Sequence, residues 1–426
     1  MKKLHILLAF SILLLMAFMP KNTNSTPSII EDEWVELING KDMTGWKVTT
    51  ENPETWSITE GGLFQAVGKR AHLFYVGEQL KDGFKNFEIE VQVKTFKLAN
   101  SGIYFHTQYQ ESGWPSKGFE IQVNNSHLGE GDHVELKRMG SLYGIRNIYG
   151  TFAKDDEWIT VKARVESDRV QIWVNGIKTV DYVPSDNPKS RVMRLSKGTF
   201  ALQGHDILSK MQYKSFKVRR LPDDTRSNIT VPTFGAWHDS LTKYQGRQFG
   251  FIDLNPKTTA SVKEMADYIY STGINVALLK DVKKAGELSE AKDYPIFKGI
   301  KVTAKNQGLA KGINADYIIG ESSNVKSAKA LLSSNIIQIW SVKGKILTAD
   351  NANILFDMAK KNNIAIEIDN ETKTPSVEML KIAKAKGCKF TFAGLMPMDK
   401  MEKSIYVIEA IKGAGITYKD LYLPRF

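Results

Sequence analysis

Cysteine is almost absent from this sequence, and other features that would indicate particular functions are missing too. Cys388 is the single cysteine among 426 residues, so no intramolecular disulfide can form. The apolar run from Ile6 to Met19 is interrupted only by Ser11 and is shorter than the roughly 20 residues that span a bilayer as a helix. The net charge is +11, but the lysines are scattered singly rather than gathered in a stripe with interleaved aromatic residues. This pattern argues against nucleic acid as a partner.

Histidine and tryptophan are unevenly distributed along the chain. All seven histidines lie at or before His238, and Trp340 is the one tryptophan beyond position 237. The hydrophobic pattern changes in the same region, from short alternating strands to an alternation of strands and helices. We therefore predict a β domain at residues 29–220, a polar, proline-bearing linker at residues 221–240, and an α/β domain at residues 241–426.

Residues 1–20 have the pattern of a signal peptide. Lys2 and Lys3 precede the apolar run, and a polar stretch, Lys21–Ser28, follows it. No small-x-small cleavage motif stands out, so an uncleaved N-terminal anchor is the alternative. Either way the chain is expected to be exported, and a single cysteine suits a bacterial periplasm or cell surface.

Short segments of alternating polarity, separated by turn residues, fill the N-terminal half. Asn175-Gly176, directly after a strand-like run, is a type I′ hairpin signal. Ten or more strands at this spacing, with almost no helical pattern, predict an all-β sandwich. The predicted strands are Trp34–Leu37, Trp56–Thr59, Gly62–Gln65, Phe87–Thr95, Gly102–Gln108, Phe119–Val123, Trp158–Glu166, Arg169–Val174, Thr199–Gln203 and Met211–Val218.

The C-terminal half alternates short apolar runs with helical stretches. Runs such as FGFIDL, NVALL and IAIEID have parallel-strand character. N-cap candidates occur at Thr258 to Ser261 and at Thr374 to Ser376, and Gly273 is a C-cap candidate. Seven βα units without a glycine-rich phosphate fingerprint predict a barrel rather than a dinucleotide-binding fold.

The segment between Ser101 and Gly144 is the strongest functional signal in the chain. It reads SGIYFHT, then GFEIQV, then GSLYG, and in each strand-like piece one face is apolar and the other polar. The polar face carries side chains that bind sugar hydroxyls and transfer protons rather than those of a plain solvated surface. Its members are Tyr104, His106, Glu120, Gln122 and Asn124, and on a later strand Gln203 and His205.

These phrases, together with WVELINGKDMTGWKV, WSITEGGL and FALQGHD, resemble the 3-keto-disaccharide hydrolase family over about 190 residues. The resemblance implies a concanavalin-like jelly-roll sandwich and cleavage of 3-keto-glycosides by a 1,2-lyase and hydratase route. The chain departs from the family pattern at three positions. His106 and Lys214 stand where arginine is usual, and Asn124 stands where aspartate is usual.

Cleavage of a 3-keto-glycoside requires a base near C2, a donor for the enolate oxygen and an acid near the leaving oxygen. Glu120 is the predicted base, and His106 is the predicted acid or enolate donor if its strand pairs with that of Glu120. Trp114, in a Gly-Trp-Pro loop, is a candidate for stacking on the sugar. The remaining substrate-binding candidates are Tyr104, Gln122, Asn124, Tyr143, Gln203 and His205.

The loop from His127 to Glu135 has a composition able to bind a divalent cation. It contains His127, Glu130, Asp132, His133 and Glu135. Their spacing fits no defined ligand motif, so no metal ligand is assigned, and ordinary loop residues are the alternative.

The C-terminal half resembles the polymerase-and-histidinol-phosphatase (PHP) domain, a distorted βα barrel that binds metals. FIDLNPKTT lies where that family opens with two histidines, and Asn255 and Lys257 occupy the histidine positions. An ammonium group there repels a metal ion. Asp253, Glu367 and Asp369 remain as carboxylates at strand ends. We expect a degenerate (βα)7 PHP-like barrel that is a scaffold or a surface for a protein partner.

Two functions agree with the sequence. The first is an exported enzyme that cleaves 3-keto-glycosides with the polar face of the sandwich. The alternative is a non-catalytic glycan-binding protein that uses the same concave face, since recognition and catalysis draw on the same types of residue.

Overall fold

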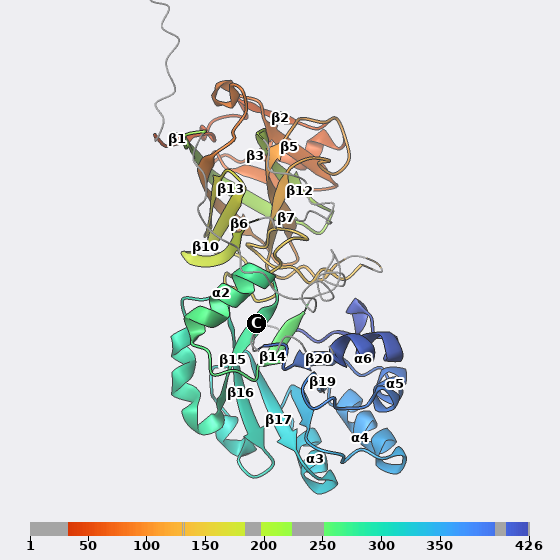
Figure 1. Cartoon of the computed structure of the whole chain (residues 1–426). Helices are drawn as coiled ribbons and strands as arrows, with labels where there is room; N and C mark the ends of the chain where they lie inside the picture. The colour runs from red at the N-terminus through yellow and green to blue at the C-terminus, as the bar shows by residue number, and fades with distance from the viewer. Residues whose placement is uncertain are drawn as a thin grey trace, which may run out of the picture.

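The computed structural model describes residues 33–129, 131, 133–183, 197–223, 251–396 and 406–424. The predicted signal peptide, residues 224–240 of the predicted linker, and loop residues Glu130 and Asp132 lie outside this part of the chain. Among the described residues, no helix is both long enough and apolar enough to cross a bilayer. The chain folds into a β-sandwich and a parallel barrel, which lie one above the other in Figure 1.

The sandwich is built from an eight-stranded and a five-stranded antiparallel sheet, which confirms the predicted all-β half. In the larger sheet the order is β11-β10-β9-β6-β13-β4-β3, and β1 pairs with β13. Its strands are β1 (Val35–Glu36), β3 (Trp56–Ile58), β4 (Phe64–Val67), β6 (Phe87–Thr95), β9 (Ile159–Glu166), β10 (Arg169–Val174), β11 (Ile177–Tyr182) and β13 (Lys210–Arg220). Short 3-10 helices, η1 (Pro53–Thr55) and η2 (Glu78–Leu80), lie in the connections.

The smaller sheet has the order β2-β5-β12-β7-β8 and differs from the larger one in how it is covered. Its strands are β2 (Trp46–Val48), β5 (Ala71–Tyr75), β7 (Asn100–Thr107), β8 (Phe119–Asn124) and β12 (Thr199–Gly204). Strand β6 of the larger sheet alternates buried and half-buried residues, as a strand with one solvated face does. In contrast, every residue of β5, β7 and β12 is buried. Loops therefore cover the second face of the five-stranded sheet.

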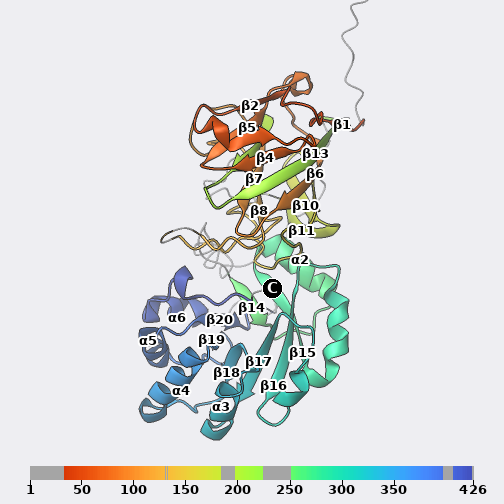
Figure 2. The ribbon, with the colours of Figure 1, turned by 180° about the vertical axis from the view of Figure 1, so that it is seen from behind.

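The C-terminal half is a closed barrel of seven parallel strands, as predicted from its alternating pattern. The strands are β14 (Ile252–Asn255), β15 (Asn275–Asp281), β16 (Phe297–Thr303), β17 (Tyr317–Ser322), β18 (Ile339–Val342), β19 (Ala365–Asp369) and β20 (Phe390–Ala393). The helices are α2 (Val262–Thr272), α3 (Val325–Leu332), α4 (Ala349–Lys361), α5 (Val377–Ala385) and α6 (Tyr406–Ala414), with 3-10 segments η3 (Val282–Ala291), η4 (Gln307–Ala310) and η6 (Tyr418–Asp420). Figure 2 shows the helices around the outside of the strands.

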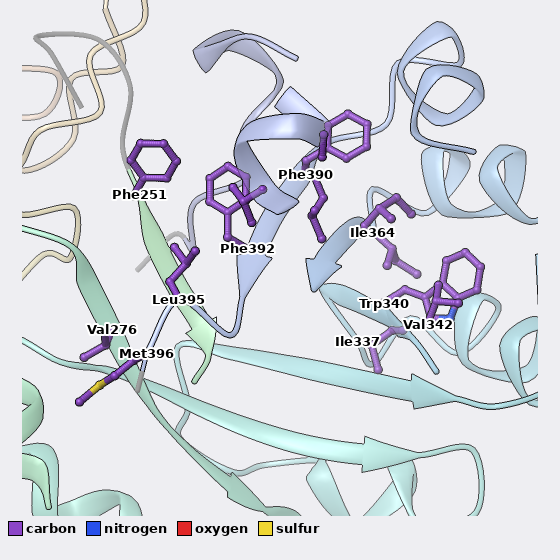
Figure 3. Packing of buried hydrophobic residues seen from close by; sticks show 14 of the residues in the cluster. Phe251, Val276, Ile337, Trp340, Val342, Ile364, Phe390, Phe392, Leu395 and Met396 are labelled. Carbon is purple, nitrogen blue, oxygen red and sulfur yellow. The ribbon is translucent and has the colours of Figure 1, made fainter. Parts of the chain in front are cut away.

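Helix caps and apolar packing explain why this sequence forms the barrel. Ser261 caps α2 in a capping box with Glu264, Ser376 caps α5, and Gly273 ends α2 in the left-handed conformation. These caps were expected from the sequence. The outer faces of the strands pack on the helices through buried residues such as Trp340 and Phe392, which Figure 3 shows from close by.

One segment of the sandwich, residues 134–152, closes the barrel at the end where its strands begin. Leu136 and Tyr149 of this segment share a hydrophobic cluster with residues at the starts of the barrel strands, among them Phe297 and Tyr317. Asn275, the first residue of β15, donates to the carbonyl of residue 147 (2.8 Å) and accepts from the amide of Tyr149 (3.2 Å). The two halves are therefore joined by a packed and hydrogen-bonded interface as well as by the linker.

Substitution of Leu136 by alanine tests this interface. Leu136 is buried, so the substitution removes apolar contacts from the base of the barrel and should lower the free energy of unfolding by about 2–5 kcal/mol. Denaturant unfolding measures the change. Leu309→Ala in η4 is the matched control, because Leu309 is 58% exposed and its loss should cost less than about 0.5 kcal/mol. Equal stability of the two variants would show that residues 134–152 do not hold the halves together.

Candidate functional site

The strand register brings the predicted polar side chains onto one face of the five-stranded sheet. Tyr104 on β7 lies opposite Glu120 on β8, and Gln203 on β12 lies opposite His72 on β5. Phe105 and Ile121, one position along, point to the opposite face and join the sandwich core. The polar face thus runs across β5, β12, β7 and β8, beneath the loops that cover it.

On this face, Glu120 lies on β8, the edge strand of the sheet, and is half-buried. Gln203 Nε2 donates to Tyr104 Oη (2.8 Å) and lies 3.3 Å from Glu120 Oε1. Gly102 on β7 is the diagonal neighbour of Glu120 across the strand pair. A Cβ added at Gly102 would lie 2.5 Å from Glu120 Oε1. The missing side chain at Gly102 therefore makes the room that the carboxylate occupies. Burial raises the pKa of Glu120 to about 7, although hydrogen bonds from Tyr104 and Gln203 oppose this shift.

A second group of ionisable side chains comes from the segment that closes the barrel. Glu135 accepts from Tyr143 Oη (3.0 Å) and pairs with Lys137 Nζ (3.1 Å) and His133 Nε2 (3.4 Å). Burial opposes the charge of Glu135, but His133 and Lys137 outweigh it and lower the pKa of Glu135 to about 2. The resulting anion adds to the rise in the pKa of Glu120. The two carboxyl groups thus have pKa values on opposite sides of the usual range.

Two histidines share one carboxylate just beyond the end of β12. Asp206 Oδ2 lies 2.6 Å from His205 Nδ1 and 3.1 Å from His127 Nε2. Burial alone would raise the pKa of Asp206, but these two partners hold it well below its usual range. Because Nδ1 of His205 bonds to Asp206, Nε2 is the nitrogen that can face a ligand. Such an aspartate–histidine pair orients an imidazole for proton transfer.

Trp114 lies over the same end of the face. Its ring centroid is 5.0 Å from that of His205 and 5.7 Å from that of His72, and the Arg70 guanidinium is 4.9 Å from the ring. Glu51 holds the Trp114 loop in place by accepting from the amide of Gly113 (2.7 Å) while it binds Arg70. Trp114 is 45% exposed, as an aromatic side chain that stacks on a sugar would be.

The structure therefore brings together Tyr104, Glu120 and Gln203, with Trp114, Tyr143 and His205 at the edges. Gln122 and Asn124 lie on the same face, but their side chains form hydrogen bonds with other groups of the protein. Gln122 Nε2 donates to Asn100 Oδ1 (2.8 Å). Asn124 is bonded to the backbone of residues 127 and 137.

The prediction that His106 lies beside Glu120 is wrong. Thr199 pairs with Thr107 and Ala201 with Tyr104, so two residues of β7, Phe105 and His106, lie opposite a single residue of β12. This bulge breaks the alternation on which the prediction depended. His106 is left-handed (φ 52°), packs edge-on against Phe87 of the other sheet, and lies 2.8 Å from the carbonyl of residue 85 through Nε2.

Four residues of the site were not predicted in these roles: His72, Glu135, Lys137 and Asp206. A signal for two of them was present, because Glu135 and Lys137 alternate with the apolar Val134 and Leu136. Asp206, which directly follows FALQGH, was a signal for a third. His72 gave none, because its strand AHLFY is otherwise apolar.

The described histidine and glutamate side chains of the loop from His127 to Glu135 do not converge on one point. His127 faces Asp206, whereas Glu135 binds His133, Lys137 and Tyr143. In the part of the chain that the structure describes, no group of three or more histidine, cysteine, aspartate or glutamate side chains is arranged to hold a metal ion.

The other end of the barrel, where its strands finish, holds lysines among carboxylates. Lys343 Nζ lies 3.5 Å from Asp369 and 3.8 Å from Glu367, and Lys257 Nζ lies 3.7 Å from Asp369. Asn255 Nδ2 donates to Glu367 (2.9 Å). Lys257 and Lys343 thus neutralise the strand-end carboxylates Glu367 and Asp369.

Asp253, the remaining predicted carboxylate, is fully buried and accepts from the amides of Gly394, Leu395 and Met396. Burial raises its pKa to about 7. Asp253 thus anchors residues 394–396 through their backbone amides.

The raised pKa of Glu120 predicts a pH-dependent gain in stability on substitution by glutamine. A carboxyl group whose pKa rises from about 4.5 to about 7 on folding destabilises the folded state above pH 4.5, and the penalty is complete above pH 7. Glu120→Gln removes the charge. It should therefore match the wild type at pH 4 and exceed its unfolding free energy at pH 8 by up to about 3 kcal/mol. Denaturant unfolding at both pH values measures this difference, and a variant less stable at pH 8 would contradict the assignment.

Comparison with known proteins finds one family model that matches the sandwich. Residues 33–219 match the family model described as the 3-keto-alpha-glucoside-1,2-lyase-like domain. No curated protein matches the chain.

Among solved structures, two crystal structures of candidate glycosyl hydrolases from Parabacteroides distasonis are 22% and 24% identical. The similarity covers 44% and 45% of this chain and 94% and 100% of theirs, with TM-scores of 0.38 and 0.36. The carbohydrate-binding module CBM66 from Bacillus subtilis is 16% identical over 41% of this chain and 95% of its own, with a TM-score of 0.30. The match of residues 33–219 to the family model thus confirms the resemblance seen in the sequence of the sandwich.

Proposed function

We propose that this protein is an exported carbohydrate-active enzyme that cleaves 3-keto-glycosides, with its reaction centre at Glu120. The observation that carries the proposal is a half-buried carboxyl group on the polar face of a sandwich, whose desolvation raises its pKa to about 7. The family match of that sandwich supports the class of substrate.

Glu120 serves as the base. A ketone at C3 acidifies the proton on C2, because the carbanion delocalises onto the ketone oxygen. Glu120 removes this proton, and its pKa of about 7 makes it a stronger base than an ordinary carboxylate while leaving a large ionised fraction near neutral pH. The electron pair of the enolate then forms the C1–C2 double bond as the glycosidic oxygen leaves C1. Water adds to C1, C2 regains a proton, and the free 3-keto-sugar is formed.

Groups around Glu120 supply the remaining functions. Burial raises the pKa of Tyr104 well above its usual range, so its hydroxyl stays protonated and able to donate to a developing negative charge. His205, held by Asp206, takes the role of acid for the leaving oxygen that His106 cannot fill. Trp114 offers a stacking surface beside it.

The non-catalytic glycan-binding alternative uses the same face and differs in what it requires of Glu120. Sugar recognition needs hydrogen-bond donors and acceptors, for which an unshifted carboxylate suffices. A half-buried carboxyl group with a raised pKa, on a face that also carries an aspartate–histidine pair, is instead the arrangement expected of proton transfer. This difference favours the enzyme.

The barrel is proposed to be a degenerate PHP-like scaffold with no reaction of its own. Lys257 and Lys343 already neutralise Glu367 and Asp369, which leaves little attraction for a metal cation. Its base holds residues 134–152, which carry Glu135 and Lys137. The C-terminal domain is also proposed to provide a surface for a protein partner.

Exchange of solvent deuterium into C2 of methyl 3-keto-α-D-glucopyranoside, followed by methanol release, tests the enzyme directly. Glu120→Gln should reduce both rates by at least about 100-fold, since general base catalysis contributes roughly 10²–10⁴-fold, while sugar binding is largely retained. Glu90→Gln is the matched control, because Glu90 lies on β6 of the other sheet and pairs with Lys162. Undiminished exchange in Glu120→Gln would remove Glu120 as the base. Binding without any exchange in the wild type would favour the glycan-binding alternative.

Gly102→Ala tests whether the position of the Glu120 carboxylate matters. The backbone of Gly102 is not left-handed, so alanine is tolerated by the strand, but its Cβ would meet Glu120 Oε1 at 2.5 Å and push the carboxylate aside. A displacement of about 1 Å lowers turnover by roughly 100-fold. We expect this loss of exchange rate with an unchanged circular dichroism spectrum. Gly308→Ala, where an added Cβ meets no atom within 4 Å, should keep the wild-type rate.

A further inference from the structure

Three buried polar atoms beneath Trp114 lack hydrogen-bond partners in the described structure. They are Nδ1 and Nε2 of His72 and Oε1 of Gln203. His72 is 0% exposed and Gln203 is 2% exposed. A buried donor or acceptor without a partner costs about 1–3 kcal/mol, so a site that keeps three of them together has a reason beyond folding.

The hydrogen bonds of Nε2 fix the orientation of the Gln203 side-chain amide. Nε2 is bonded to Tyr104 Oη and lies close to the Glu120 carboxylate, both of which act as acceptors for it. The oxygen Oε1 is therefore a true acceptor that points away from Glu120.

His72 and Gln203 are direct neighbours across the β5–β12 ladder, which places their Cβ atoms about 5 Å apart on the polar face. His72 packs edge-on against Tyr104 and Trp114 at 5.7 Å each and is not bonded to either. Burial lowers the pKa of His72 to about 3, so the ring is neutral at physiological pH and has one N–H donor and one acceptor nitrogen. The pair thus offers a donor and an acceptor side by side.

We propose that His72 and Gln203 form a subsite for one hydroxyl group of the sugar, with Trp114 as its cover. A hydroxyl group both donates and accepts, so it satisfies Gln203 Oε1 and one ring nitrogen of His72 at the same time. The Trp114 side chain, which is partly exposed and lies at the tip of a loop, moves aside and stacks on the ring of the bound sugar. The subsite deepens the proposed function and rests on it for the class of ligand.

The proposal has a consequence for specificity. A pocket that leaves polar atoms unpaired when empty discriminates strongly against an analogue lacking the matching hydroxyl, because the unpaired atoms then stay buried. An apolar pocket of the same shape would not make this distinction.

Binding of deoxy sugars to the full-length protein tests the subsite. The probes are methyl 3-keto-α-D-glucopyranoside and its 2-deoxy, 4-deoxy and 6-deoxy analogues, measured by calorimetry in Glu120→Gln to prevent turnover. One of the three analogues should bind at least ten-fold more weakly than the parent sugar. In Glu120→Gln with His72→Phe, the parent and that analogue should bind equally weakly, and His72→Asn should recover part of the difference.

His106→Phe in the same background is the matched control. His106 is also a buried histidine with an unpartnered ring nitrogen, but it lies on the other side of the sheet, so the affinity for all four sugars should be unchanged. Thermal unfolding separates binding from folding, because His72→Phe removes unpaired nitrogens and should not lower the midpoint.

Two results would overturn the proposal: wild-type affinity in His72→Phe, or an equal loss for all the analogues. A wrong proposed function would give a different result. The binding pattern described above would still be seen, but the wild-type protein would show no deuterium exchange.

Discussion

The partial burial of Glu120 is the constraint on which the rest of the site depends. A carboxylate on an open sheet face would be solvated and would keep an ordinary pKa. Loops over the five-stranded sheet remove that solvent, Gly102 leaves the space for the side chain, and Tyr104 and Gln203 hold it in one orientation. The same cover buries His72 without a partner. The proposed base and the proposed hydroxyl subsite thus have one physical origin, which is a polar surface that loops cover.

Residues 134–152 belong to the sandwich but pack against the base of the barrel, so they link the two halves of the chain. The alternation of this segment places Leu136 in the base of the barrel and Glu135 with Lys137 toward Glu120. A shift of the barrel would therefore change the electrostatic environment of Glu120. This provides a physical role for a barrel whose own strand ends are occupied by lysine–carboxylate pairs. Lys257 and Lys343 give the buried carboxylates Glu367 and Asp369 partners of opposite charge, without which burying those charges would be costly.

Much of the fold and part of the site could be predicted from the sequence. The change in hydrophobic period separated sandwich from barrel, and the alternation within β7 and β8 placed Tyr104 and Glu120 on one face. These inferences succeeded because they depend on local periodicity, which the backbone geometry enforces. His106 was misplaced because a bulge adds one residue to β7, and a bulge depends on the partner strand rather than on the strand itself.

The sequence by itself determined the two fold types and the chemical character of the polar face. Only the tertiary structure decided the pKa of Glu120, the pairing of His205 with Asp206 and the unpartnered state of His72. The physical reason is that burial and hydrogen bonding arise from segments far apart in the chain. Residues 114, 135 and 203 meet around one sheet face, and no local pattern specifies which side chains they cover.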